Sequence, residues 1–380
     1  MKKEAFVLQK RNLLPYNQDT APCLCRVRQS ARAKGVRKMR ATIKDVAKEC
    51  GVSVSAVSMA LSDKPSRISE DTRQKVREAA ARLNYHPNRA ALSLVNRKSR
   101  MIGIVMNDVR NTHIAALFMA VNRELSGTGY SLISHILEER TQDAGLKLIN
   151  QIASENVAAL VWARPLETDK QEELSNLRKN VEGLGIPVIT MDDYGFDCPG
   201  ADVCFDYRQG GFLATRHLLE LGHRRIGCLA GDQFYYVTQE RIEGYRQALG
   251  EFGVPYDKKL VYYGDYSMDS GYEAFSYLMG QRVSAIFSSN DEMAFGLYRA
   301  ARNYRIRIPK DISLVGFDNV PFADIMETPL TTVRVPSVEM GSFIGRTLIE
   351  LLGESENTER KKVFYKPDLL RRGSAVEREL

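Results

Sequence analysis

The sequence lacks the marks of a membrane protein, a secreted disulfide protein or a metal centre. No run approaches the roughly 18 consecutive apolar residues that a membrane helix needs, and the basic N-terminus lacks the apolar stretch of a signal peptide. The six cysteines are scattered, and the Cys23–Cys25 pair has no second Cys or His pair nearby. We therefore expect reduced thiols, no metal, no cofactor, no membrane contact and a cytoplasmic location.

Motifs of common enzymes are also missing. The chain contains no G-x-S-x-G nucleophile elbow, no P-loop, no G-x-G-x-x-G after a strand and no H-E-x-x-H. Carboxylates such as Asp192 and Asp318 are chemically suited to acid–base work, but nothing in the sequence pairs them. We expect that the protein binds partners and is not an enzyme.

Positive charge is confined to one end of the chain. Residues 1–100 contain 23 Lys and Arg against 8 Asp and Glu, a net charge of +15, whereas residues 101–380 contain 31 against 39, a net charge of −8. A basic end can be a solvated face, or it can bind nucleic acid, whose phosphates the acidic remainder would repel. The length of 380 residues with 44% hydrophobic residues allows two or three compact units.

Residues 42–62, TIKDVAKECGVSVSAVSMALS, predict two short helices joined by a sharp turn. Apolar residues share one face of each helix: Ile43, Val46 and Ala47 on the first, Val54, Val57 and Leu61 on the second. Gly51 gives the turn its backbone freedom, and Ser53 is placed to cap the second helix. The spacing of Ala47, Gly51 and Val57 is typical of a helix-turn-helix that places its second helix in the DNA major groove. The alternative is a plain helical hairpin of an unrelated bundle.

A third helix completes this unit. Ser69 can cap a helix that Asn84 and Pro87 end, and its apolar face consists of Val76, Ala79, Ala80 and Leu83, with Thr72 in the first turn. We therefore place a helix-turn-helix headpiece at residues 41–85.

The segment 86–98 can form one or two helical turns but has no partner helix nearby in the sequence. Such a segment is unstable alone, so we expect a hinge helix that folds when it docks on DNA. Four basic residues accompany it and suit phosphate contacts: Arg89, Arg97, Lys98 and Arg100.

Residues 1–40 form a basic extension without clear periodicity. Two interpretations compete: a disordered basic arm, or an upstream start codon with Met39 as the true initiator, which we favour. We assign no structure to this extension.

From residue 101 onward, short apolar strands alternate with amphipathic helices. Strands are predicted at 101–106, 130–137, 157–163, 186–192, 225–230, 260–263, 284–289 and 312–317, and helices near 113–126, 141–154, 169–182, 207–221, 238–252, 269–280 and 291–304. This alternation predicts doubly wound parallel sheets. The run near 193–206 has no helix and divides two similar α/β lobes.

The chain then returns between the lobes. A second crossing is expected at PLTTVRVP, followed by a helix at 337–352 and a final strand near 363–372. The core of residues 99–380 therefore has a first lobe at about 99–200 and 334–362, and a second at about 201–331 and 363–375. This is the topology of a periplasmic-binding-protein-like core.

The headpiece and the core together resemble the lac/gal repressor family of bacterial transcription regulators. The matching motifs are, in family order, TIKDVAKECGVS, AVS, LNYHPN, RAALSL, IGIVMND, LGHRRIGCLAG, RIEGY, SSNDEMAFG, DISLVGFDN and PLTTVRVP. The resemblance covers roughly 340 of the 380 residues and leaves out only residues 1–40. It implies the two-lobed core and the small all-α headpiece already inferred.

Candidate DNA contacts lie on the second helix and on the hinge. Val54 and Met59 can offer apolar contact to a thymine methyl, and Ser55 can hydrogen-bond to either base type. The resemblance implies that the matching positions read the operator and that Leu94 enters its minor groove, unless Leu94 packs on the partner hinge. The chain departs from the common pattern at Ala56, where many members have Thr, and at Met59. The full set is Thr42, Ser53, Val54, Ser55, Ala56, Ser58, Met59, Asn88, Arg89, Ala91 and Leu94.

Candidate effector contacts follow strands, at the edge where doubly wound sheets bind small molecules. They are Asn107, Asn111, His113, Asp192, Phe205, Tyr235, Arg241, Tyr266, Asn290 and Asp318. An arginine with amides, carboxylates and aromatic rings suits a polyhydroxylated ligand, and the resemblance implies sugars or purines at Arg241, Asn290 and Asp318. Any one of them can instead cap a helix or strand, and His113 can be a core residue.

These observations predict a homodimeric, operator-specific transcriptional repressor of carbohydrate-metabolism genes, controlled by a sugar-type effector. Its operator is expected to be palindromic, because a dimer's symmetry appears in its site. The alternatives are a sugar-binding protein without operator-specific regulation and a nonspecific architectural DNA-binding protein.

Overall fold

The structure is a computed structural model that describes residues 41–62, 67–86, 99–137, 141–164, 167, 171–353 and 359–378. The chain divides into two compact units, Met1–Asn88 and Arg89–Leu380, which are described separately. The predicted extension at 1–40 and most of the predicted hinge at 86–98 lie outside the described residues.

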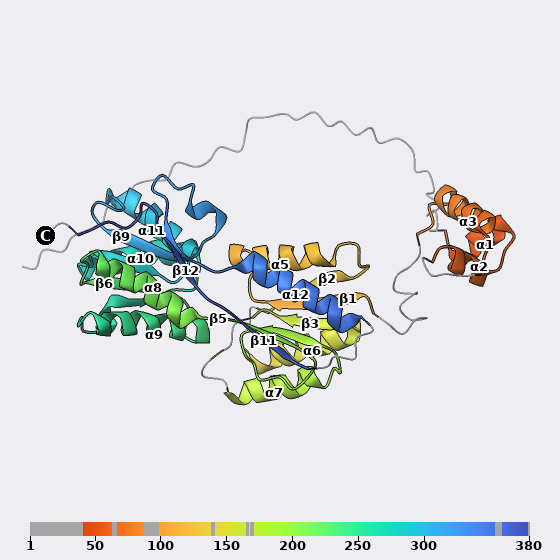
Figure 1. Cartoon of the computed structure of the whole chain (residues 1–380), viewed down its shortest axis with the longest axis horizontal. Helices are drawn as coiled ribbons and strands as arrows, with labels where there is room; N and C mark the ends of the chain where they lie inside the picture. The colour runs from red at the N-terminus through yellow and green to blue at the C-terminus, as the bar shows by residue number, and fades with distance from the viewer. Residues whose placement is uncertain are drawn as a thin grey trace, which may run out of the picture. The chain divides into compact units, whose positions relative to one another are not determined.

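The described residues of the first unit form three helices, α1 (Ile43–Cys50), α2 (Val54–Ala60) and α3 (Glu70–Arg82) (Figure 1). Their shared core consists of small side chains: Val46, Ala47, Val57, Ala60, Val76, Ala79 and Ala80. Gly51 ends α1 with φ +66, a conformation that favours glycine and turns the chain into α2. The predicted helix-turn-helix and its third helix are confirmed.

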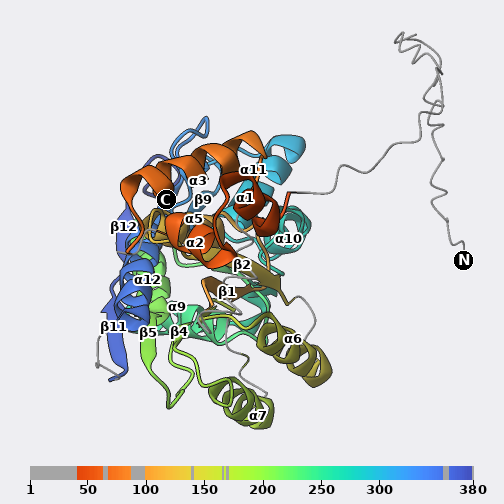
Figure 2. The same ribbon diagram turned by 90° about the vertical axis from the view of Figure 1, so that its right-hand side faces the viewer.

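The first lobe of the second unit is built on a six-stranded, fully parallel sheet of order β11-β5-β4-β3-β1-β2. Its strands are β1 (Met101–Met106), β2 (Ser131–Ile136), β3 (Ala159–Trp162), β4 (Val188–Met191), β5 (Gly200–Phe205) and β11 (Lys361–Tyr365). Helices α5 (Thr112–Leu125) and α12 (Ser337–Leu352) cover one face, and α6 (Gln142–Glu155) and α7 (Gln171–Glu182) cover the other (Figures 1 and 2). The near-continuous apolar strands are buried between these two layers.

The second lobe repeats this plan with the order β12-β10-β9-β8-β6-β7, in which only the β10–β12 pair is antiparallel. Its strands are β6 (Ile226–Ala230), β7 (Val261–Tyr263), β8 (Ala285–Ser288), β9 (Ser313–Asp318), β10 (Thr331–Arg334) and β12 (Asp368–Leu370). Helices α8 (Tyr207–Glu220) and α9 (Tyr236–Glu251) pack on one face, and α10 (Met268–Gly280) and α11 (Asp291–Tyr304) on the other. Short 3-10 turns lie at Lys258–Leu260 and Pro321–Ala323.

The lobe boundaries differ from the predicted ones. The predicted second lobe began at 201, but β5 pairs with β4, so the first lobe extends to Phe205. The predicted final strand at 363–372 is two strands in different sheets: β11 pairs with β5 in the first lobe, and β12 with β10 in the second. Because β10 itself extends to Arg334, the second crossing starts after that residue. The chain thus crosses between the lobes three times.

Within the described part of the chain, no helix is both long and apolar enough to cross a membrane. The same residues contain no group of three or more His, Cys, Asp or Glu side chains arranged to hold a metal ion.

Candidate functional site

Helix α2 starts at a side-chain cap. Ser53 Oγ accepts a hydrogen bond of 3.1 Å from the backbone N–H of Ala56, which satisfies one of the free donors of the first turn. In α1, the backbone N–H and the hydroxyl of Thr42 both donate to the Asp45 carboxylate at 2.8 Å. These local bonds fix the start of both helices.

Helix α2 presents an uncharged surface. Val57 and Ala60 are buried in the headpiece core, whereas Val54 is 41% exposed and Met59 is 44% exposed. Val54 therefore does not share the buried face with Val57, as its spacing first suggested; Ala60 and the partly buried Leu61 complete that face. Ser55 is also exposed, and Ala56 and Ser58 are half-buried. Such a helix can read bases by apolar contact and hydroxyl hydrogen bonds, without the bidentate contacts of Arg, Asn or Gln.

Four predicted DNA contacts lie outside the described residues. They are Asn88, Arg89, Ala91 and Leu94, all in the predicted hinge.

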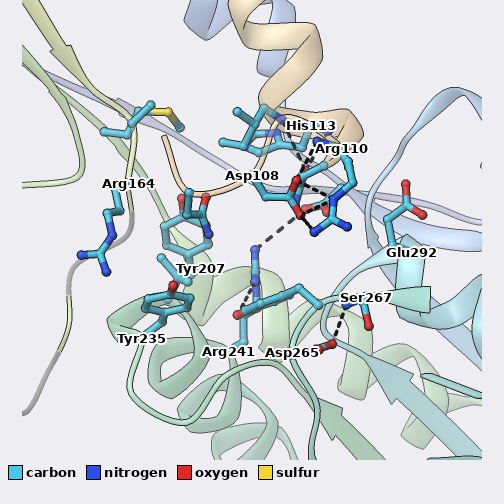
Figure 3. A pocket seen from close by; sticks show the side chains of 18 of the residues that line it. Asp108, Arg110, His113, Arg164, Tyr207, Tyr235, Arg241, Asp265, Ser267 and Glu292 are labelled. Atoms are coloured by element: carbon cyan, nitrogen blue, oxygen red, sulfur yellow. Dashed lines mark hydrogen bonds and ion pairs between the residues drawn. The ribbon is translucent and has the colours of Figure 1, made fainter. Parts of the chain in front are cut away.

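A cavity of about 360 Å³ lies between the two lobes and is lined by side chains of both (Figure 3). Its volume falls in the range typical of small-molecule sites. Eight of the ten predicted effector residues line it: Asn107, Asn111, His113, Asp192, Tyr235, Arg241, Tyr266 and Asp318. The C-terminal ends of parallel strands from two sheets therefore converge on one volume.

Arg241, on α9, is the central cation of this cavity (Figure 3). Its Nη1 donates a 3.0 Å hydrogen bond to the Tyr266 hydroxyl, and its Nη2 lies 3.8 Å from Asp318 Oδ1. The guanidinium carbon lies 4.2 Å from the Phe317 ring centre and 5.0 Å from that of Tyr207. Since these contacts come from several elements, the guanidinium is held in one orientation before a ligand arrives.

A glycine brings Arg241 to this position. A Cβ atom at Gly211, on α8, would lie 2.2 Å from the backbone oxygen of Arg241. Only a residue without a side chain allows α8 and α9 to approach this closely.

Two buried carboxyl groups face the same space. Burial raises the pKa of Asp192 from 3.8 to about 7, although the charge of Arg241 lowers it. Burial likewise raises the pKa of Asp318 well above its ordinary value, against the opposing charge of Arg241. Asp192 follows β4 and Asp318 ends β9, and both residues have a positive backbone φ, +72 at Asp192 and +107 at Asp318. Strained backbone of this kind is common at ligand sites.

His113 and Asn111 begin α5 at the edge of the cavity. The Asn111 side chain caps the helix by accepting from the backbone N–H of His113 at 3.0 Å. His113 Nδ1 lies 2.5 Å from Ser337 Oγ, and burial lowers the pKa of His113 to about 4. His113 is therefore an uncharged hydrogen-bonding group at neutral pH.

Two predicted effector residues do not line the cavity. The Phe205 ring packs beneath it, with ring centres 5.1 Å from Tyr207 and 6.1 Å from Phe317. Asn290 caps α11 by accepting from Met293 N, and its Nδ2 donates to Tyr266 O at 2.9 Å. Both side chains support lining residues and are turned away by local packing.

The sequence prediction missed several lining residues, among them Asp108, Arg110, Arg164, Tyr207, Asp265, Ser267 and Glu292. Most lie one or two positions from a residue that was predicted: Asp108 follows Asn107, and Glu292 is two residues after Asn290. Including the neighbours within two residues of each predicted position would have found them. Arg164 follows β3, a strand end that the prediction did not use.

Known proteins match this architecture along nearly the whole chain. The regulator DegA of Bacillus subtilis, strain 168, is 33% identical over 341 residues, which cover 88% of this chain and 98% of DegA. Residues 42–88 match the family described as bacterial regulatory proteins, lacI family, and residues 215–375 match a periplasmic binding protein-like domain. The chain belongs to the lacI family.

Two solved structures agree with this assignment. A CelR–cellobiose complex shares 29% identity with a TM-score of 0.64, covering 88% of this chain and all of that one. The lac repressor dimer bound to operator and the anti-inducer ONPF shares 24% identity with a TM-score of 0.76, covering 88% and 99%, and supports the fold alone. This lacI-family protein is thus a DNA-binding transcriptional regulator with a helix-turn-helix headpiece and a two-lobed core.

Proposed function

We propose that this regulator acts as a homodimer on a palindromic operator and that a sugar-type effector in the cavity controls its DNA binding. The observation that carries the proposal is the cavity of about 360 Å³, lined by both lobes around the buried Arg241. A ligand there contacts both lobes at once, so its binding energy depends on their relative orientation.

The lining of the cavity supports a polyhydroxylated ligand. Tyr207, Tyr235 and Tyr266 offer aromatic faces, and the Tyr235 and Tyr266 rings lie 6.5 Å apart at 24°. Such faces pack against the C–H surfaces of a sugar ring, while Arg241 and the carboxylates bind its hydroxyls. The CelR structure is a complex with a sugar, cellobiose, and this adds support by similarity.

Contacts that cross the cleft provide the means of control. The Thr112 hydroxyl, in the first lobe, donates to Glu292 Oε1 of the second lobe at 3.1 Å. Glu167 and Tyr235 form an isolated antiparallel bridge between the lobes. A ligand that strengthens or breaks these contacts shifts the lobes between two arrangements, which we propose order or melt the hinge at 86–98. A full switch needs a preference of about 10⁴-fold for one arrangement.

The chemistry of α2 supports a dimer on a symmetric site. Its seven residues, VSAVSMA, carry no charge, so a single headpiece has few strong base contacts. Two headpieces related by two-fold symmetry double the number of contacts and require a palindromic site. The proposed contacts are Thr42, Ser53, Val54, Ser55, Ala56, Ser58 and Met59, together with the hinge residues Asn88, Arg89, Ala91 and Leu94.

The proposal is tested with the full chain. An operator selected from random DNA is labelled, and its binding is followed by fluorescence anisotropy with and without pools of sugars, alongside sedimentation of the free protein. We expect a dimer, a palindromic site and a sugar that changes the affinity at least tenfold.

Two matched variants locate the effect. Arg241→Ala removes the central cation of the cavity, whereas Arg246→Ala removes an arginine of the same helix whose side chain is 48% exposed. We expect the sugar response to disappear in the first variant and to survive in the second. A monomer that binds DNA tightly, or a response that survives Arg241→Ala, would contradict the proposal.

A further inference from the structure

Each arginine of the cavity already has a carboxylate partner. Arg110 Nε lies 3.0 Å from Asp108 Oδ1, and Arg241 Nη2 lies 3.8 Å from Asp318 Oδ1. Arg164 makes a close ion pair with Glu167, and both side chains are buried. The positive charges of the lining are therefore balanced without a ligand.

Three further carboxylates line the same cavity: Asp192, Asp265 and Glu292. None of them forms an ion pair with a Lys or Arg within the described ranges; Arg241 acts on Asp192 only at longer range. Asp265 Oδ1 accepts from the backbone N–H of Ser267 at 2.9 Å, and Glu292 Oε1 accepts from the Thr112 hydroxyl. These bonds come from neutral donors, so no cation balances the charges of Asp265 and Glu292, whereas burial raises the pKa of Asp192 to about 7 and keeps its carboxyl largely protonated below that pH.

The two unpaired carboxylates, Asp265 and Glu292, constrain the ligand. Closing the lobes removes water from the carboxylates, which raises the cost of each uncompensated charge. The pKa of Asp192, raised to about 7 by burial, shows that this cost is already large in the free cavity. An anionic ligand such as a phosphorylated sugar would increase the cost of uncompensated charge. A neutral ligand would leave this cost unchanged, and a cationic ligand would remove it.

The cavity also presents buried donors that need acceptors. Arg241 Nε and Arg164 Nε are buried and have no hydrogen-bond partner among the residues that the structure describes. In Figure 3, Arg164 and Tyr235 lie on one side of Arg241, and Asp265, Ser267 and Glu292 lie on the other. One end of the cavity therefore offers N–H donors and aromatic rings, and the other offers the carboxylates of Asp265 and Glu292 beside the Arg110–Asp108 ion pair.

We propose that the effector is an amino sugar, a polyhydroxylated ring with a protonated amine. Its ammonium group binds between Asp265 and Glu292, and its ring oxygens accept hydrogen bonds from Arg241 and Arg164. This inference rests on the proposed function, because it assumes that the cavity is the effector site.

The test uses matched sugars on the full chain at about pH 6.5, where an amine of this type is protonated. Glucosamine, galactosamine and mannosamine are each compared by calorimetry with the N-acetyl derivative, the parent hexose and the hexose 6-phosphate. We expect at least one amino sugar to bind about tenfold more tightly than its three counterparts, since it alone gains a charge pair. A neutral or phosphorylated sugar that binds more tightly than every amino sugar overturns the inference.

Charge-removing variants test the position of the amine. Asp265→Asn and Glu292→Gln keep the side-chain shape and the acceptor oxygen, so we expect each to weaken the amino sugar about tenfold and to leave its N-acetyl derivative unchanged. Asp269→Asn is the control, because that side chain is 84% exposed on α10 and pairs with Arg299. Equal losses for the charged and acetylated sugars would overturn the inference.

Arg241→Ala separates the two proposals. If a neutral or anionic sugar binds most tightly and Arg241→Ala abolishes its binding, the cavity is the effector site and only the amino-sugar inference fails. If no sugar binds, or if the tightest sugar is unaffected by Arg241→Ala, the proposed function fails as well.

Discussion

The two proposed binding surfaces of this protein are built in opposite ways. The headpiece presents one short, uncharged helix on the outside of a small core, and Val54 and Met59, which we propose contact bases, are exposed. The cavity collects buried charged groups, such as Arg241, Asp192 and Asp318, from the ends of strands in two sheets. Specificity at the headpiece depends on which side chains point outward. Specificity in the cavity depends on how much burial raises the free energy of its charged groups.

The hydrophobic cores that support these two surfaces also differ, in the size of the side chains that they bury. Seven buried residues, all Val or Ala, hold the headpiece together, and such a small core gives marginal stability. The two-lobed unit buries large side chains such as Trp162, Tyr245 and Phe317. The headpiece should therefore unfold more easily and independently, which the following predictions exploit.

The largest expected difference between the two surfaces is their response to salt. If a dimer neutralises about eight phosphates, log K for the operator falls with log salt at a slope of roughly −7, or about 10⁴-fold between 50 and 200 mM. Effector binding in a buried cavity is screened far less, and we expect it to change by less than about threefold. Anisotropy and calorimetry over the same salt series measure both. A DNA slope near zero would refute the headpiece assignment.

A charge buried in the headpiece should unfold that unit and leave the two-lobed unit folded. Val57 has no exposed surface, so Val57→Asp places a carboxylate in a core of Val and Ala at a cost of about 3–5 kcal/mol. We expect headpiece unfolding and a loss of operator affinity of about 10³-fold, with effector binding unchanged. Val54→Ala, on the exposed face of the same helix, is the control and should leave the headpiece folded. Loss of effector binding in Val57→Asp would show that the units are not independent.

Replacement of Asp192 should change the pH dependence of the core. Its carboxyl is protonated in both states below pH 3.8, but between 3.8 and about 7 only the unfolded chain ionises. Asp192 therefore lowers the free energy of unfolding as pH rises through this window, by about 2–4 kcal/mol in total. We expect Asp192→Asn to match the wild type near pH 4 and to exceed its stability by about this amount above pH 7.

Urea unfolding followed by the fluorescence of Trp162 measures this effect. Trp162 is the single tryptophan of the chain and lies buried in β3, so its signal reports on the core alone. Asp193→Asn is the matched control with the opposite sign, because a hydrogen bond from Lys362 lowers the pKa of Asp193. Asp193→Asn should therefore lower the free energy of unfolding at pH values above the ordinary pKa of an aspartate. A gain for Asp192→Asn at pH 4 as large as at neutral pH would contradict the charge argument.

The sequence predicted the alternation of the core but not every pairing. Strand β5 was missed because GADVCF starts with a glycine and contains Asp202, a charge that breaks the apolar run. Asp202 is buried because it pairs with Arg360, which lies 158 residues later in the chain. A partner so distant cannot be inferred from local pattern, and the same is true of the split between β11 and β12.

Prediction of the candidate sites from local sequence pattern was limited in the same way. Strand ends located the cavity, although they predicted only eight of its 20 lining residues, because parallel strands end at a common edge, a rule that needs no knowledge of side-chain direction. Phe205 and Asn290 obeyed that rule and still point elsewhere, into the ring cluster of Phe317 and onto the backbone of α11. The exposure of Val54, in contrast, depends on which face of α2 the other two helices cover, and that face contains Val57, Ala60 and the partly buried Leu61.

The smallest effect we expect is at Met59. Its exposed side chain can contact a thymine methyl, and such a contact is worth about 1 kcal/mol, so Met59→Ala should weaken the preferred operator about fivefold for each headpiece, or about 25-fold for the dimer. Replacing single thymines by uracil removes the methyl from the DNA side. If the contact exists, one uracil position weakens the wild type by a similar factor and has no further effect on Met59→Ala. Gln74→Ala, on the exposed face of α3, should keep full sensitivity to uracil. Additive losses from Met59→Ala and every uracil would mean that Met59 touches no base, and that α2 reads its site through Ser55 or Val54 instead.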